Sequence, residues 1–193
     1  MLISSDFEVA QPVGRVWTFF DDIRQVAACL PGAELTDDLG NDTYAGTVGV
    51  RMGPVRMTFA GTAKVERDEA DRRVVVDASG ADQKGRGQAA MLVTATLAAT
   101  PQGTRVMVQQ DIQLSGAAAQ FGRGMVADVS AVLVRDFATN MQNRLIALEK
   151  GLDPDQVGAA KPAGGFAIAL RATWMALARV ARRFFAPYRP VSG

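Results

Sequence analysis

Histidine is absent from the 193 residues of this sequence, and cysteine occurs once, at Cys29. Without histidine the chain has no Ser–His or Cys–His nucleophilic pair, and it lacks the commonest side-chain ligand of transition metals. A single cysteine excludes an internal disulfide and leaves too few ligands for a structural zinc site or an iron–sulfur cluster. We therefore expect no metal site and no covalently bound cofactor.

A secretory signal and C-terminal acidic residues are also missing. The chain does not begin with a basic region followed by an apolar run and a cleavage site, which predicts a cytoplasmic protein. Residues 156–193 contain no Asp or Glu and carry a charge of +6, so residues 1–155 sum to −5 within the net charge of +1. This division predicts a basic tail with a binding partner of its own.

The first 34 residues predict a strand followed by short helices. Apolar residues alternate in residues 2–10, and Pro12 stands where a helix can begin. Asp21 and Asp22 interrupt the helical pattern, and we expect them to cap a second helix. The apolar residues at helical spacing are Val13, Val16, Trp17 and Phe20, then Ile23, Val26 and Ala27.

Six further segments have the alternation or composition of strands, and one helix follows them. The strand segments are 33–38, 43–51, 55–67, 72–79, 88–100 and 103–114. Residues 117–150 place apolar side chains every three or four residues, which predicts a helix of about 50 Å. This pattern predicts an α+β domain over residues 1–150, a curved seven-stranded antiparallel sheet wrapped on a long C-terminal helix.

A curved sheet under one helix leaves a cleft, and we expect methionine and small residues to line it. By their small or adaptable side chains these are Met52, Met57, Gly61, Ala63, Met91, Ala95, Met125 and Met141. The predicted ligand contacts are Phe20, Leu30, Met52, Met57, Phe59, Met91, Val93, Leu114, Phe121, Met125, Val129, Leu133 and Phe137. No charged residue is expected on this inward face, so the ligand should be largely apolar, with Tyr44 and Asp111 as candidate hydrogen-bonding groups. The alternative is that the apolar side chains simply fill a core.

Three smaller features have plain structural interpretations. Residues 80–87 are polar and rich in glycine, which predicts a mobile loop. Gly85-Arg86-Gly87 lies within it and is expected to be solvated rather than to bind phosphate, because no strand-to-helix junction follows. Cys29 lies in an apolar helical segment without a neighbouring cation, which predicts a buried, unreactive thiol.

The C-terminal residues read as a flexible linker, 151–165, and an amphipathic tail, 166–193. Aromatic and aliphatic residues lie on one helical face and arginines on the other, without an acid, which is typical of a helix in a membrane interface. The predicted membrane-binding residues are Phe166, Leu170, Arg171, Trp174, Leu177, Arg179, Arg182, Arg183, Phe184 and Phe185. A spanning helix fits badly, because each arginine at membrane depth costs about 2.5–3.5 kcal/mol. The alternative is a helix packed on its own domain or on a second copy.

Several short motifs in residues 1–150 resemble a known family. They are Phe7-Glu8-Val9, Pro12-Val13, Val16-Trp17, Phe20, Asp22, Cys29-Leu30-Pro31-Gly32-Ala33, Gly46, Val50, Gly53-Pro54 and Phe59-Ala60-Gly61. The chain resembles the CoxG family, named for the CoxG subunit of carbon monoxide dehydrogenase, whose helix-grip fold is that of the START-like (SRPBCC) superfamily. The resemblance implies a protein without catalytic residues that accompanies molybdenum carbon monoxide dehydrogenase, either recruiting that enzyme to the membrane or handling a respiratory quinone for it.

Three functions remain open at this point. The leading hypothesis is a non-enzymatic carrier of a long-tailed quinone such as menaquinone, bound non-covalently, which links the dehydrogenase to the respiratory chain. The second is a membrane anchor for the dehydrogenase without a ligand, and the third is a START-like enzyme such as a cyclase or hydratase. The first two place the protein at the inner face of the cell membrane with lipid as a partner, and none involves nucleic acid.

Overall fold

The computed structural model describes residues 1–155. The remaining residues, which include most of the predicted linker and the whole tail, lie outside this part. The described strands are β1 (Leu2–Val9), β2 (Ala33–Gly40), β3 (Thr43–Met52), β4 (Val55–Asp68), β5 (Arg73–Asp82), β6 (Gln88–Thr100) and β7 (Gly103–Leu114). The described helices are α1 (Val13–Phe19), α2 (Ile23–Cys29), the 3-10 helix η1 (Gly116–Gln120) and α3 (Arg123–Glu149).

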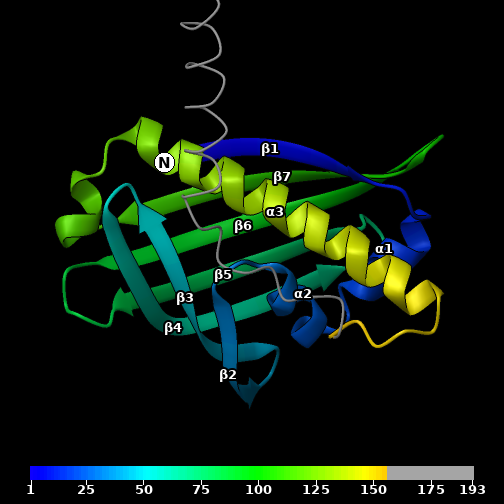
Figure 1. The fold of residues 1–193 in the computed structure, drawn as a ribbon, viewed down its shortest axis with the longest axis horizontal. Coiled ribbons are helices and arrows are strands. Elements are labelled where there is room, and N and C mark those ends of the chain that lie inside the picture. The colour runs from blue at the N-terminus through cyan, green and yellow to red at the C-terminus, as the bar shows by residue number, and fades with distance from the viewer. Residues whose placement is uncertain (156–193) are drawn as a thin grey trace, which may run out of the picture. The chain divides into compact units, whose positions relative to one another are not determined.

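The strands form one antiparallel sheet in the order β1-β7-β6-β5-β4-β3-β2. Hairpins connect β2 through β7 in sequence, whereas β1 pairs with β7 and is followed by α1 and α2. The long helix α3 crosses the concave face of the sheet diagonally (Figure 1). The prediction of a seven-stranded antiparallel sheet wrapped on a long helix is confirmed.

Glycines form a row across the three strands where neighbouring backbones approach most closely. Gly61 pairs with Gly46 on one side and with Gly80 on the other. A Cβ added to Gly46 would lie 2.7 Å from the carbonyl oxygen of Glu34, and one on Gly61 would collide with that of Ser79. Glycine is therefore required here for the close approach of the strands, and the row does not simply leave space for a ligand.

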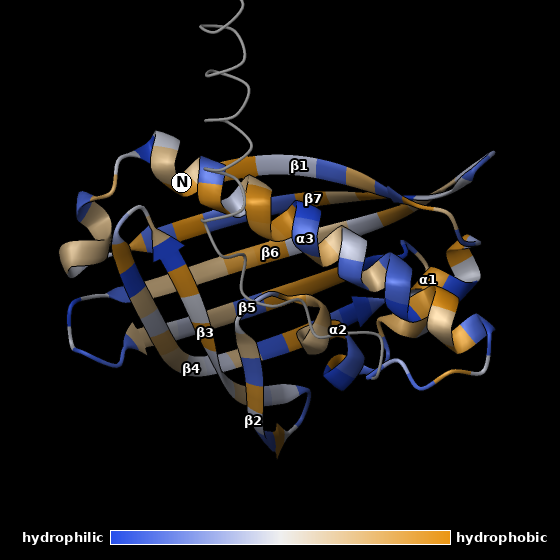
Figure 2. Cartoon of the chain, viewed as in Figure 1, coloured by the Kyte–Doolittle hydropathy of each residue, from blue (hydrophilic) through white to orange (hydrophobic). Residues whose placement is uncertain are grey.

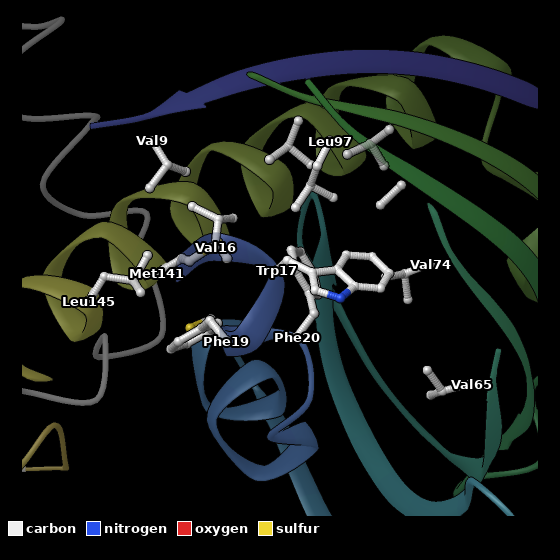
Figure 3. Close-up of a cluster of buried hydrophobic side chains, with 14 residues drawn as sticks. Val9, Val16, Trp17, Phe19, Phe20, Val65, Val74, Leu97, Met141 and Leu145 are labelled. Atoms are coloured by element: carbon white, nitrogen blue, oxygen red, sulfur yellow. The ribbon is translucent and has the colours of Figure 1, made fainter. Parts of the chain in front are cut away.

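A buried apolar cluster fills the part of the concave face next to α1 (Figure 3). Val16, Trp17 and Phe20 from the first helical segment meet Met141 and Leu145 of α3 there. The sheet side of the cluster consists of Val9, Val65, Val74, Ala95, Leu97, Val106 and Val108. We call this part the packed half of the concave face.

The boundaries of two predicted segments were wrong. The long helix begins at Arg123 rather than at residue 117, because the chain forms η1 and then becomes extended at Gly122, with φ −60° and ψ 154°. Strand β5 continues to Asp82, so the predicted loop of residues 80–87 shortens to the five residues that follow Asp82. None of the helices in the described part is long and apolar enough to cross a membrane.

Candidate ligand-binding face

The strand register places one continuous set of side chains on the concave face beyond the packed half. Strand partners link Tyr44 to Ala63, Ala63 to Ala78, and Ala78 to Met91. The side chains of this region that stay partly exposed are Tyr44, Val48, Phe59, Ala63, Ala78, Met91 and Ile112. We call this region the open half of the concave face.

Partial exposure distinguishes the open half from the packed half. Core side chains such as Leu97 and Val106 are at most 5% exposed, whereas Phe59 and Met91 stay half-buried although they lie on the same face. Ala63 and Ala78 are too short to fill the space beside them, and no larger side chain replaces them there. The open half is therefore accessible apolar surface on the inside of the fold, the arrangement that an apolar ligand requires.

The predicted ligand contacts divide between the two halves and the rim. Phe20 belongs to the buried cluster, and Met52 and Met57 are also buried. Phe59, Met91, Val93 and Leu114 lie on the concave face and are half-buried, as are Leu30 after α2, Phe121 before α3, and Val129, Leu133 and Phe137 on α3.

Two methionines of α3 depart from the predicted lining. Met125 is 40% exposed, and its methyl group lies near Gly53 of the β3–β4 turn. Met141 is 0% exposed and belongs to the core, so it is filled space rather than ligand surface. Two surface grooves of about 500 and 490 Å³ border α3 outside the open half, one against β1 and one against α1.

The two polar candidates lie on opposite faces of the sheet. Tyr44 is on the concave face, half-buried, and its hydroxyl has no hydrogen-bond partner among the described residues. Asp111 lies on the convex face and accepts a hydrogen bond of 2.7 Å from the N-terminal amine of Met1, so its prediction as a ligand contact was wrong. Sequence reasoning also missed Gln110, a buried side chain that accepts a 2.9 Å hydrogen bond from Ser130 and joins β7 to α3.

One acidic residue does lie on the concave face, contrary to expectation. Asp82 stands opposite Phe59 and its side chain is fully buried. Its carboxylate accepts hydrogen bonds from Arg86 at 2.7 and 2.9 Å and from the backbone amides of Thr58, Lys84 and Arg86. The loop after β5 is thus built around this ion pair, and the expectation of a solvated Gly85-Arg86-Gly87 is wrong for Arg86.

The hydrogen bonds from Arg86 hold the pKa of Asp82 below its usual range, despite the opposing effect of burial. A depressed folded-state pKa means that ionised Asp82 stabilises the fold above its unfolded pKa, and that this contribution is lost as pH falls toward the folded value. We expect Asp82→Asn to lower the urea midpoint at neutral pH and to flatten its decline below about pH 4. Asp77→Asn, at an exposed position of the same strand, is the control, and a wild-type slope in Asp82→Asn would contradict the assignment.

Polar contacts fasten α2 to the C-terminal half of α3. Cys29 is fully buried, as predicted, and burial raises its pKa to about 12. Asn140 donates to the carbonyl oxygen of Cys29 at 2.9 Å, and buried Arg144 donates to Gln25 and, at 2.9 Å, to Asp155. Asp22 caps α2 by accepting from the amide of Gln25, as expected, whereas Asp21 lies 3.9 Å from Arg67. These contacts are structural, because the thiol stays protonated.

Metal chemistry has no evident place in the described part of the chain. Within residues 1–155, no group of three or more Cys, Asp or Glu side chains is positioned to hold a metal ion. The candidate site is therefore defined by apolar surface with Tyr44 as its accessible polar group.

The family model that describes CoxG, the CoxG subunit of carbon monoxide dehydrogenase, matches residues 6–146. The chain belongs to the CoxG family. The match spans nearly the whole described domain, so the resemblance of the short motifs is confirmed over the region in which they occur. No curated protein matches the sequence.

Solved structures show the same fold at low sequence identity. A conserved protein from Geobacillus kaustophilus aligns with a TM-score of 0.68 and 18% identity, covering 76% of this chain and 95% of its own. A protein from Thermus thermophilus aligns with a TM-score of 0.57 and 14% identity, covering 77% and 99% of the two chains. The Zhui aromatase/cyclase from a Streptomyces species aligns with a TM-score of 0.56 and 14% identity, covering 76% and 94%. These likenesses show a shared START-like helix-grip fold.

Proposed function

We propose that this CoxG family member is a non-enzymatic carrier of an apolar ligand, and that the ligand is a long-tailed respiratory quinone such as menaquinone. The observation that carries the proposal is the open half of the concave face. Apolar side chains there remain accessible beneath α3, while the same face is fully buried a few residues along each strand. Burial of a quinone ring and the start of its tail on this surface is favoured by about 25 cal/mol per Å² of apolar area removed from water.

The family supplies the biological setting of the proposal. A protein associated with carbon monoxide dehydrogenase serves an enzyme whose electrons must reach an acceptor, and quinones are apolar acceptors that reside in the membrane. Because this chain has no histidine and a single, buried cysteine, it has few groups that could hold a redox centre of its own. A bound quinone would instead carry the electrons.

The groups on the concave face that could transfer a proton do not form a catalytic pair. On strands β3 to β7, the carboxyl and phenol groups on this face are those of Asp82 and Tyr44. Asp82 follows Ala78, which lies in the same cross-strand line as Tyr44, by four residues, or about 13 Å along the strand. Asp82 is also fully engaged by Arg86 and backbone amides, which leaves it no proton to transfer. This arrangement favours a carrier over an enzyme, although an aromatase/cyclase shares the fold.

Extraction of the protein from its native host tests the carrier directly. We expect organic solvent to release a quinone in a near-equal molar ratio to the purified protein, and mass spectrometry to identify it. A protein that is purified without quinone and does not take up added menaquinone would contradict the carrier. The anchor function, in which the domain only binds the dehydrogenase and the tail holds the membrane, would then stand in its place.

Tyr44 offers the carrier a hydrogen bond to a quinone carbonyl. Its hydroxyl is on the open half and has no partner among the described residues. We expect Tyr44→Phe to weaken menaquinone binding about three- to tenfold, the range of one net hydrogen bond, without lowering thermal stability. Titration of bound quinone measures the change, and Tyr188→Phe, at the other tyrosine of the chain, is the control. Equal affinities of Tyr44→Phe and the parent would remove Tyr44 from the site.

We further propose that the tail of residues 166–193 binds the inner membrane surface, with residues 151–165 as a linker. The support is the sequence, which combines aromatic residues and arginines without an acid. A peptide of residues 160–193 should gain helical circular dichroism on vesicles that contain anionic lipid. A spectrum unchanged by lipid would contradict the proposal.

A further inference from the structure

Basic residues gather at one end of the described domain, although the domain as a whole is acidic. This end contains the β3–β4 turn, the loop between β5 and β6, and the segment that leads through η1 into α3. Residues 49–58, 83–88 and 115–125, which form these connections, contain five basic residues and no acid. The five, which we call the basic end, are Arg51, Arg56, Lys84, Arg86 and Arg123.

Contacts between the three segments bring these residues to one surface. Arg51 and Arg56 face each other across the β3–β4 hairpin. Arg86 donates to the carbonyl oxygen of Arg56 at 2.8 Å, and its own carbonyl oxygen accepts from the amide of Ala117 in η1. A Cβ on Gly53 would lie 3.9 Å from the methyl group of Met125 in the first turn of α3. The three connections therefore form a continuous end of the molecule, which Figure 1 shows around the free end of the β3–β4 hairpin.

The charges at this end are not neutralised within the described domain. Arg51, Arg56 and Lys84 are exposed and form no ion pair with another described residue, and Arg123 donates only to the carbonyl oxygen of Leu2. Nearby acids are occupied: Asp82 is paired with Arg86 and Asp111 with the N-terminal amine. Asp128 follows one turn later on α3. Like charges directly opposite on paired strands are destabilising, so the Arg51–Arg56 pair is not explained by stability.

Apolar side chains are interspersed with these cations. Pro54 at the hairpin turn is exposed, Met125 is 40% exposed, and Phe121 is half-buried. Figure 2 shows the same mixture, with hydrophilic colour on the β5–β6 loop and hydrophobic residues on the neighbouring β3–β4 hairpin. Cations that reach phosphate groups beside side chains that enter the acyl boundary are the two components of an interfacial membrane site.

We propose that the basic end is a second membrane-docking surface, built into the folded domain, which seats it on anionic phospholipid headgroups. The choice of a lipid surface over an acidic protein rests on the exposed apolar residues among the cations and on the position of the open half. Phe59 and Val48 of the open half belong to the cross-strand row of Asp82, whose carboxylate is held by Arg86 of the basic end. The proposal rests on the carrier function and deepens it, because docking here brings the accessible apolar face next to the bilayer from which a quinone would enter.

Flotation of the full chain with quinone-free vesicles tests the docking surface. The vesicles contain phosphatidylcholine with or without phosphatidylglycerol, and the variant is Arg51→Gln/Arg56→Gln/Lys84→Gln, which leaves Arg86 and Arg123 in place. The matched control, Arg73→Gln/Arg105→Gln/Lys150→Gln, removes the same charge from the opposite end of the sheet. Both sets are exposed, so thermal stability should change little. Each set is made in the parent chain and in a chain with Arg171, Arg179, Arg182 and Arg183 changed to Gln, which separates docking from the tail.

We expect the basic-end variant to bind anionic vesicles about a hundredfold more weakly at low salt, from roughly fivefold for each cation near the surface. The control should retain parental affinity, and vesicles without phosphatidylglycerol should bind all proteins weakly. Unchanged binding of the basic-end variant, or an equal loss in the control, would overturn the proposal, as would a loss confined to binding of the dehydrogenase. Because the vesicles contain no quinone, docking that survives in a protein found to carry no quinone would refute the carrier alone.

Discussion

Replacing Met141 by alanine is expected to lower the free energy of unfolding by about 2–5 kcal/mol, the range for buried methionine truncated in a core. The side chain is 0% exposed and lies in the cluster that joins α1, α3 and the sheet. Removal of its thioether leaves a cavity that rigid neighbours such as Trp17 and Leu145 fill only in part. Since small domains have total stabilities of about 5–15 kcal/mol, this one change removes a large share.

Met125→Ala is the matched control, because both methionines are on α3 and the substitution has the same effect on helix propensity at each. Met125 is 40% exposed, so its loss should cost well under 1 kcal/mol, as expected of a surface substitution. Urea unfolding followed by circular dichroism measures both, and a shift in midpoint without a change in slope identifies a stability effect. Equal midpoints for the two variants would contradict the division of the concave face into a packed and an open half.

The sequence predicted both methionines equally well and could not tell them apart. They fall on the same apolar stripe of α3, with Val129, Leu133 and Phe137 between them. Which end of the stripe meets α1 and which end stays accessible depends on where the first helical segment packs after β1, and that is a tertiary fact. The helix itself was predictable from periodicity, whereas its burial was not.

Alternation alone determined the concave face where the strands were regular, and it was misapplied at two acidic residues. Val106, Val108 and Ile112 alternate inward on β7, which already places Asp111 on the other face. Asp82 has the parity of Val74, Val76 and Ala78 on β5, but Gly80 interrupts the apolar pattern and led us to predict a loop. The reason for that glycine is the close backbone approach near Gly61, which depends on strand pairing and leaves no local signal.

The polar contacts that position α3 were beyond reach for a different reason. Ser130 and Gln110 are twenty residues apart, and Arg144 meets Gln25 across more than a hundred. Each is an ordinary surface residue by type, and only the packing of α3 on the sheet buries it. The family resemblance therefore contributed the functional hypothesis, while the residues that hold the site had to come from the structure.

Filling the open half is expected to abolish ligand binding while the fold survives. Ala78 is half-buried between Ala63 and Met91 in one cross-strand line, and no larger side chain covers it there. In Ala78→Phe the phenyl ring would occupy the surface on which the proposed quinone ring lies. We expect menaquinone uptake to fall at least tenfold, because the lost contact area cannot be recovered elsewhere on the face.

Ala81→Phe is the control for this change, since Ala81 is on the same strand but exposed on the convex face. Retention of quinone, circular dichroism and melting temperature are compared for both variants and the parent. A strained Ala78→Phe would melt earlier by the cost of overpacking, about 1–3 kcal/mol, so Ala63→Leu on the neighbouring strand provides a smaller obstruction with the same expected loss of uptake. If both obstructed variants fold and still bind menaquinone at parental affinity, the ligand does not lie on the open half, and the carrier proposal loses the observation on which it rests.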